Sequence, residues 1–113
     1  MVDYFPNQGD IVWLEFEPQK GKEINKIRPA LVVSPQKYNK KTGLALFMPI
    51  TRQIKEYPFE FLLKGKKVEG VILCDQIRSL DWKARKASYL DKISAEQYRE
   101  IIEKFSVLLT LIP

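Results

Sequence analysis

An arginine followed by a proline starts an apolar run, and this pair is the part of the sequence best suited to chemistry. Arg28 precedes Pro29, and residues 30–33 are apolar. Proline has a fixed φ and biases the residue before it toward extended backbone, so the guanidinium is expected to project from the rigid start of a strand. A guanidinium held in this way suits the binding of a phosphate. Without further context, the pair also fits a surface arginine bound to a nearby carboxylate.

Missing residue types narrow the chemistry. The 113 residues contain no histidine and one cysteine, Cys74. The lack of histidine excludes RNA cleavage by paired imidazoles, the usual zinc sites and a Ser-His-Asp triad. The aspartates stand singly, without the dense carboxylate set that two-metal catalysis needs. We therefore expect no cofactor, and any cleavage of nucleic acid is expected to proceed without a metal ion.

Length and composition predict one domain, residues 1–113, of the soluble globular class. Hydrophobic residues make up 45% of the chain and charged residues 29%. No apolar run approaches the roughly 20 residues that span a bilayer, so no membrane partner is expected. The first residues lack the pattern of a signal peptide. The single cysteine cannot form an internal disulfide, which fits a cytoplasmic location.

Positive charge exceeds negative charge and is unevenly distributed. There are 19 Lys and Arg against 14 Asp and Glu, a formal charge of +5. The cations gather in three segments that apolar runs separate: 20–28, 64–67 and 78–86. These segments are expected in loops or at strand ends. The balance favours a polyanionic partner.

The apolar and β-branched runs predict a β-barrel. The six expected strands cover residues 11–16, 28–34, 44–50, 59–63, 71–76 and 86–93. Residues 17–27 form a loop of about ten residues, roughly twice the usual length, and long loops in small domains often bind a ligand. Residues 38–43 resemble a turn, and 81–85 a short helical turn.

The last part of the chain predicts an amphipathic helix. Ser94 and Gln97 can form a capping box, and apolar residues follow at helical spacing as far as Ile112. Apolar helix faces usually pack on a core, so we expect this helix to lie across the barrel rather than to bind RNA or a membrane.

Five short motifs, taken in order, resemble the MazF/PemK family of toxin endoribonucleases. They are Gly9-Asp10-Ile11-Val12-Trp13, Arg28-Pro29-Ala30, Pro49-Ile50-Thr51, Tyr57-Pro58-Phe59 and Asp75-Gln76-Ile77-Arg78. The resemblance implies a mainly β fold with α, an SH3-like barrel with a C-terminal helix (MazF/CcdB-like), that forms a homodimer. It also implies a toxin that cuts single-stranded RNA at short sequences and that a MazE-like antitoxin restrains.

The resemblance makes Arg28 and Thr51 the catalytic candidates, with Glu23 as a possible helper. In such a reaction the 2′-hydroxyl of RNA attacks the adjacent phosphate, leaving a 2′,3′-cyclic phosphate and a 5′-hydroxyl. Arg28 would bind the phosphate oxygens and Thr51 would fix one more. Neither side chain is a suitable general base, because arginine stays protonated and a threonine hydroxyl is weakly basic. Glu23 either accepts the proton or is a solvated loop carboxylate.

Further residues are expected to bind the RNA. They are Lys20, Asn39, Tyr57, Asp75, Gln76 and Arg78. The ring of Tyr57 suits a splayed nucleotide, while Asp75 and Gln76 either read a base or only shape the loop. Some family members place an arginine two residues before this aspartate as an acid-base partner, and Leu73 stands there instead, which argues against that role for Asp75. Other aromatic residues can stack bases but are expected mainly in the core: Trp13, Phe16, Tyr38 and Trp82.

Two other functions fit parts of the pattern. A CcdB-like gyrase poison is thought to share this barrel, but it acts through a tryptophan-glycine-isoleucine ending, and this sequence ends Leu111-Ile112-Pro113. A noncatalytic nucleic-acid-binding barrel would need only the basic charge and the stacking residues. Cleavage that is lost in Arg28→Ala would separate an enzyme from a binder.

Overall fold

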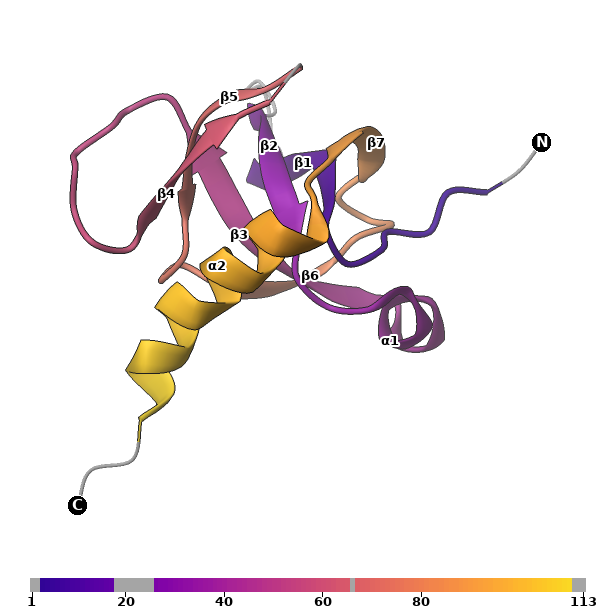
Figure 1. Cartoon of the computed structure of the whole chain (residues 1–113). Coiled ribbons are helices and arrows are strands. Elements are labelled where there is room, and N and C mark those ends of the chain that lie inside the picture. The colour runs from indigo at the N-terminus through magenta and orange to yellow at the C-terminus, as the bar shows by residue number, and fades with distance from the viewer. Residues whose placement is uncertain (1–2, 18–25, 66, 111–113) are drawn as a thin grey trace.

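The computed structural model describes residues 3–17, 26–65 and 67–110. Within them a seven-stranded sheet is followed by a C-terminal helix (Figure 1). The strands are β1 (Asp10–Glu17), β2 (Lys26–Val32), β3 (Leu44–Thr51), β4 (Glu60–Lys64), β5 (Glu69–Leu73), β6 (Arg78–Asp81) and β7 (Ser88–Lys92). The helices are α1 (Gln36–Thr42), α2 (Ala95–Ser106) and a short 3₁₀ helix, η1 (Val107–Leu109).

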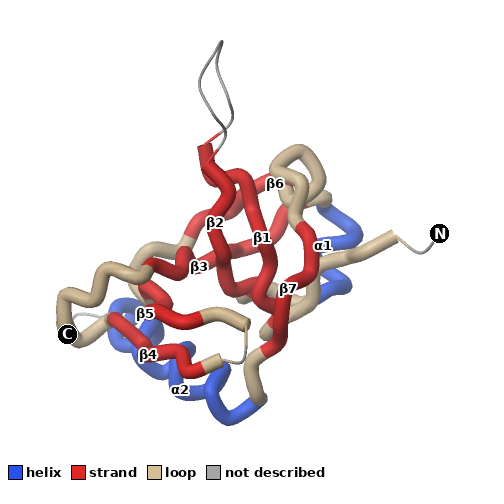
Figure 2. The backbone as a smooth tube through the Cα atoms, turned by 90° about the horizontal axis from the view of Figure 1, so that it is seen from above, coloured by secondary structure: helices blue, strands red, loops and turns tan. Residues whose placement is uncertain are grey.

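The sheet curls into a barrel-like form without closing. Its strand order is β4-β5-β3-β2-β1-β7, and β6 also pairs with β3. All the strand pairs are antiparallel. The edge strands β4 and β7 do not pair with each other, so a gap remains in the ring (Figure 2). The expected barrel-like fold with a C-terminal helix is confirmed.

Alternating side chains of the sheet enter two buried clusters. Leu31 on β2 enters one cluster with Ile11, Met48 and Ile72, whereas its neighbour Ala30 enters the other with Val12 and Phe47. This alternation is the period of two that a strand imposes. A strand with both faces buried reads as a continuous apolar run, which is why the residues after Arg28 are nearly all apolar.

The C-terminal helix begins where the sequence predicts. Ser94 Oγ accepts a hydrogen bond from Gln97 N at 3.1 Å, and the Gln97 side chain accepts one from Ser94 N at 3.0 Å. Ile101 is fully buried in the first cluster, and Tyr98 donates to the carbonyl of Val33 at 2.7 Å. These contacts hold α2 against the sheet. The helix ends at Ser106, and Ile112 lies outside the described residues.

The segment predicted as a turn at 38–43 is a helix instead. α1 begins after Pro35 and ends at Gly43, whose φ of 77° is left-handed. The residues of α1 are mostly polar, so the sequence pattern did not indicate that one of them, Asn39, is buried. The Asn39 amide donates to the carbonyls of Pro6 and Ser34, both at 2.9 Å, and accepts from Ser34 Oγ at 2.5 Å. The expectation that Asn39 binds RNA is therefore wrong, because its side chain is fully buried and hydrogen-bonded within the protein.

The region after β5 also differs from the prediction. The strand expected at 71–76 ends at Leu73, so Asp75 and Gln76 lie in the connection to β6. β6 was not expected, because it has only four residues and little apolar pattern. It forms by pairing with the first half of β3, with Phe47 opposite Arg78.

Candidate functional site

Arg28 and Thr51 stand at the ends of two neighbouring strands. The pairing of β2 with β3 runs as far as Ala30 opposite Pro49, so Arg28 lies two residues before this pair on β2 and Thr51 two residues beyond it on β3. Because the two strands are antiparallel, both residues lie at the same end of the paired segment. Both residues line a cavity of about 430 Å³ that also includes Arg52 and Gln53. The structure thus brings together the two residues that the sequence motifs indicate.

The hydroxyl of Thr51 is oriented by the backbone that follows it. Thr51 Oγ1 accepts a hydrogen bond from Gln53 N at 3.2 Å. A hydroxyl that accepts from a backbone N–H can still donate its own proton to a ligand oxygen. The local turn and a phosphate contact are therefore compatible roles for this side chain.

Gly70 on β5 allows the sheet to pack closely behind Thr51. Its φ is +140°, and a Cβ at this position would collide with the backbone carbonyl of Thr51. Only glycine adopts this conformation without strain. The sequence analysis missed Gly70, although a glycine inside a strand pattern is a signal of close backbone approach.

A second cavity of about 410 Å³ continues the first. It shares Thr51 and Gln53 with the first cavity and extends between the β3–β4 loop and the end of β5. Its lining residues are Thr51, Gln53, Lys55, Tyr57, Glu60, Leu73 and Gln76. We call the two joined cavities the groove. Four of the predicted residues line it: Arg28, Thr51, Tyr57 and Gln76.

Tyr57 is linked across the groove wall to Asp75. The Tyr57 hydroxyl donates a hydrogen bond to Asp75 Oδ1, which joins the β3–β4 loop to the connection after β5. This hydrogen bond is the main reason that the pKa of Tyr57 rises to about 12, with desolvation adding to it. Asp75 therefore orients the ring of Tyr57, which is expected to contact RNA. The next residue, Gln76, lines the groove.

Substitution of Asp75 tests this link. The pKa of Tyr57 in the folded protein is about 12 against an ordinary value of 10.0, so the folded state favours the neutral phenol. The link then stabilises the fold below about pH 10 and is lost as the pH rises toward 12. In Asp75→Asn we expect the pKa of Tyr57 to fall toward 10.0. Tyrosinate absorbance during an alkaline titration measures it, with Tyr57→Phe identifying the signal. Identical titrations of the wild type and Asp75→Asn would contradict the link.

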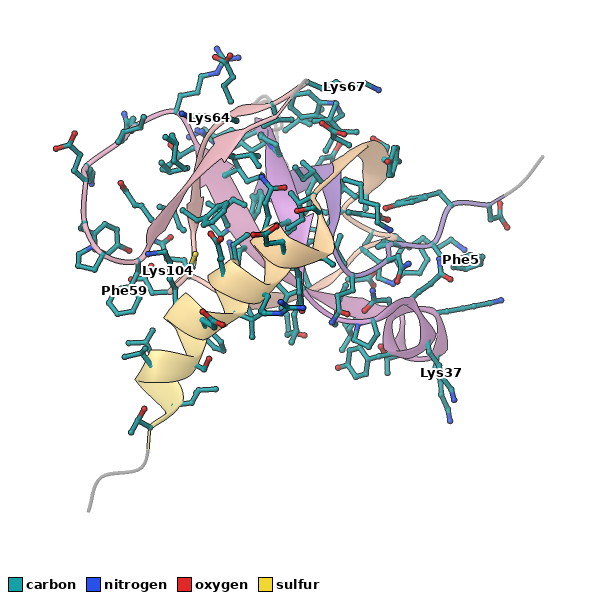
Figure 3. All side chains as sticks on the ribbon, viewed as in Figure 1. Phe5, Lys37, Phe59, Lys64, Lys67 and Lys104 are labelled. Atoms are coloured by element: carbon teal, nitrogen blue, oxygen red, sulfur yellow. The ribbon has the colours of Figure 1, made fainter. Side chains whose placement is uncertain are left out.

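Glu60 holds the loop that carries Tyr57. Its carboxylate accepts hydrogen bonds from the backbone N–H groups of Lys55, at 3.1 Å, and Glu56, at 2.9 Å. Glu56 has a left-handed φ of 57°, a conformation that needs such support. Lys104 on α2 adds a hydrogen bond to the carbonyl of Pro58 at 3.1 Å, close to Phe59 (Figure 3). The sequence analysis did not identify Glu60, because a carboxylate that binds backbone N–H groups leaves no motif.

The remaining predicted residues lie apart from the groove or outside the described structure. Arg78 lies on β6 opposite Phe47, on the face of β3 that also carries Thr51, with its guanidinium 5.9 Å from the ring centre of Phe16. It lines neither cavity of the groove. Lys20 and Glu23 lie outside the described residues.

Cations outnumber carboxylates among the charged residues that line the groove. The first cavity has three cations, Arg28, Arg52 and Lys67, and one carboxylate, Glu69. The second cavity has one cation, Lys55, and one carboxylate, Glu60. Lys67 projects beyond the hairpin of β4 and β5 (Figure 3). Glu60 is already bound to backbone N–H groups. The groove therefore presents excess positive charge, which suits a phosphate chain.

Two negative findings apply to the described residues, 3–17, 26–65 and 67–110. No three His, Cys, Asp or Glu side chains among them are grouped so that they could hold a metal ion. Within the same part of the chain, every helix is too short or too polar to cross a membrane.

Comparison with protein families gives one match that covers most of the chain. Residues 7–109 match the family described as PemK-like, MazF-like toxin of type II toxin-antitoxin system. Endoribonuclease toxin MazF of Escherichia coli strain K12 is 44% identical over 106 residues, covering 94% of this chain and 96% of that protein. Endoribonuclease PemK of Escherichia coli is 31% identical over 108 residues, covering 91% and 81%.

Two solved structures match almost the whole chain. A crystal structure of MazF from Deinococcus radiodurans matches with a TM-score of 0.84 and 46% identity, covering 95% of this chain and 98% of that one. A chain of the MazE-MazF complex from the same organism matches with a TM-score of 0.87 and 46% identity, covering 95% and 97%.

Proposed function

The chain belongs to the PemK-like, MazF-like toxins of type II toxin-antitoxin systems and is a MazF-like endoribonuclease toxin, and we propose that it cuts single-stranded RNA at a short sequence without a metal ion. The observation that carries the proposal is that Arg28 and Thr51 line the same cavity of a groove with excess positive charge. RNA contains its own nucleophile, the 2′-hydroxyl, so the protein needs only to position the phosphate, stabilise charge and transfer protons.

Each of the two residues has a defined part in this mechanism. Arg28 donates hydrogen bonds to the non-bridging oxygens of the scissile phosphate as negative charge builds on them. The Thr51 hydroxyl, oriented by Gln53 N, donates a further hydrogen bond to one of these oxygens. The 2′-hydroxyl gives its proton to a general base and its oxygen bonds to phosphorus as the bond to the 5′-oxygen breaks, and the leaving 5′-oxygen takes up a proton from water. The products are a 2′,3′-cyclic phosphate and a 5′-hydroxyl.

The general base is a carboxylate in this proposal. Neither a protonated arginine nor a threonine hydroxyl can take the proton from the 2′-hydroxyl. We propose Glu23, in the segment between β1 and β2, for this role. Glu69 is a second candidate for the general base, because it lines the same cavity as Arg28. Comparing the pH–rate profiles of Glu23→Gln and Glu69→Gln distinguishes them, because loss of the base removes the rise in rate with pH.

End-group analysis tests the proposed reaction. A defined single-stranded RNA is cut in EDTA, and the cut is then repeated on an RNA with one 2′-deoxynucleotide at the cleaved position. We expect 5′-hydroxyl ends on the first RNA and no cut at the substituted position on the second, because the nucleophile is absent. Cleavage of the deoxy-substituted RNA, or 5′-phosphate ends, would contradict attack by the 2′-hydroxyl.

We also propose a homodimer, as the family resemblance implies, neutralised by a MazE-like antitoxin in the cytoplasm. The exposed apolar residues at the end of the chain, Val107 and Leu109, support an interface there. Charged substitutions, Val107→Glu with Leu109→Glu, are expected to give a monomer by light scattering and to abolish cleavage. A monomer that cuts RNA as well as the wild type would contradict the need for a dimer.

Relatives support the proposed antitoxin. The matched Deinococcus radiodurans structures include MazE-MazF complexes. A groove with excess positive charge also suits an acidic protein segment, so an antitoxin that covers Arg28 and Thr51 would block RNA by competition.

A further inference from the structure

An apolar pocket outside the groove adjoins Arg28. It has a volume of about 450 Å³ and is lined by Trp13, Glu15, Ile27, Lys86 and Ser88. The strand register explains why these residues meet, because Trp13 lies opposite Ser88 and Glu15 lies opposite Ile27. We call it the Trp13 pocket.

The Trp13 pocket exposes apolar surface instead of adding to the core. Trp13 is 40% exposed and Ile27 is 56% exposed, whereas Ile11, two residues before Trp13 on the same face, is buried. Phe16 and Trp82 are buried as the sequence predicts, whereas Trp13 and Tyr38, which is 42% exposed, depart from that expectation. An indole beyond the end of the core remains available to stack on a planar ligand.

The pocket and the groove share a wall. Trp13 and Ile27 line both the pocket and the cavity that contains Arg28 and Thr51. Trp13 also lies opposite Pro29, the residue after Arg28. A ligand bound at Arg28 can therefore reach the pocket without leaving the protein surface.

We propose that the Trp13 pocket binds a nucleobase of the single-stranded RNA, next to the phosphate held by Arg28, stacked on the indole of Trp13. This inference rests on the proposed function. Bases splayed from a single strand bind aromatic side chains in this way, with polar groups reading their edges. Glu15 and Lys86, an ion pair at 3.8 Å, place an acceptor and a donor beside the stacked position.

The charge of the pocket favours a base over an acidic peptide. Glu15 lines the pocket, and its side chain is 13% exposed, so a ligand that fills the pocket lies beside a carboxylate with little contact to solvent. An exocyclic amino group of a base can donate to this carboxylate, whereas the carboxylates of an acidic segment would be repelled.

The first measurement compares cleavage by Trp13→Ala and Trp13→Phe. For an RNA cut by the wild type, we expect Trp13→Ala to raise KM about tenfold and to change kcat less than about threefold, since one stack is lost. Trp13→Phe keeps a ring and should restore most of the affinity. Tyr38→Ala is the matched control, because Tyr38 is 42% exposed but lies on α1, away from the groove. We expect it to cut like the wild type.

The second measurement locates the base. The same RNA, blocked by a 2′-O-methyl group at the cleaved nucleotide, is bound while tryptophan fluorescence is recorded. Trp82 is buried and donates to the carbonyl of Asn39 at 2.8 Å, so Trp13 is the indole expected to respond. Abasic substitution at one position beside the scissile phosphate should remove the fluorescence change and also remove the difference between wild type and Trp13→Ala.

The outcomes separate this inference from the proposed function. If the wild type cuts RNA and no abasic position depends on Trp13, the pocket proposal is overturned and the proposed function stands. A fluorescence response to polyglutamate but not to the blocked RNA would also overturn it, in favour of an acidic protein partner. If the wild type cuts no RNA, both proposals fail.

Discussion

Replacing Arg28 by alanine is expected to lower kcat/KM for RNA cleavage by about a thousandfold, the upper end for loss of one donor to a developing charge. The guanidinium lines the same cavity as Thr51, and a water molecule cannot supply its two parallel hydrogen bonds to a phosphate. Arg28→Lys keeps the charge but loses the planar fork, so we expect an intermediate rate. Single-turnover cleavage of a mapped RNA measures the effect.

Two controls separate catalysis from folding in this experiment. Arg28 is exposed, so its removal should change the free energy of unfolding by no more than about 0.5 kcal/mol. Arg99→Ala removes an exposed cation from α2, which lines neither cavity of the groove, and should cut like the wild type. If Arg28→Ala and Arg99→Ala lower kcat/KM by the same factor, the loss of net charge explains the effect and the position of the Arg28 guanidinium does not.

Replacing Gly70 by alanine is expected to have the largest effect on stability. A Cβ there collides with the carbonyl of Thr51 in a backbone conformation, φ +140°, that alanine rarely adopts. Both effects destabilise the fold, together by about 3 kcal/mol, which would lower the midpoint of thermal unfolding by more than about 10 °C. Protein that still folds would have Thr51 displaced, so we also expect kcat at saturating RNA to fall about a hundredfold, the cost of a misplacement of about 1 Å.

Gly43 supplies the matched control for Gly70. It also has a positive φ, 77°, but a Cβ there would contact nothing within 4 Å. Gly43→Ala should therefore cost only about 1 kcal/mol, the conformational part of the effect, and leave cleavage unchanged. Equal losses of stability and activity in both variants would show that the contact with Thr51 is unimportant.

The barrel-like fold and six of its seven strands could be predicted because they depend on patterns that the sequence carries locally. Buried strands read as apolar runs, and the capping box at Ser94 marks the start of α2. Arg28 and Thr51 could be selected because each stands in a motif at the end of such a run. Their position in one cavity became visible only in the structure, since it depends on contacts between segments that are distant in the sequence.

The errors also have physical causes. β6 forms because β3 offers it a partner, so its own four residues did not predict it. Asn39 was misjudged because a polar side chain in a polar segment gives no sign that it will be buried and hydrogen-bonded. Gly70 and Glu60 support Thr51 and Tyr57 through backbone contacts, which no side-chain motif records. Sequence reasoning thus identified groove residues more readily than the residues that hold them in place.

The most direct test of the central claim is to incubate the purified wild type and Arg28→Ala with a long, defined single-stranded RNA in EDTA and to map the ends by sequencing. We expect the wild type to make discrete cuts at one short sequence and Arg28→Ala to make no detectable cuts in the same incubation, while both proteins unfold at nearly the same temperature. Intact RNA after incubation with folded wild-type protein, or the same cuts by both proteins, would contradict the claim that the Arg28 and Thr51 groove is a metal-independent ribonuclease site.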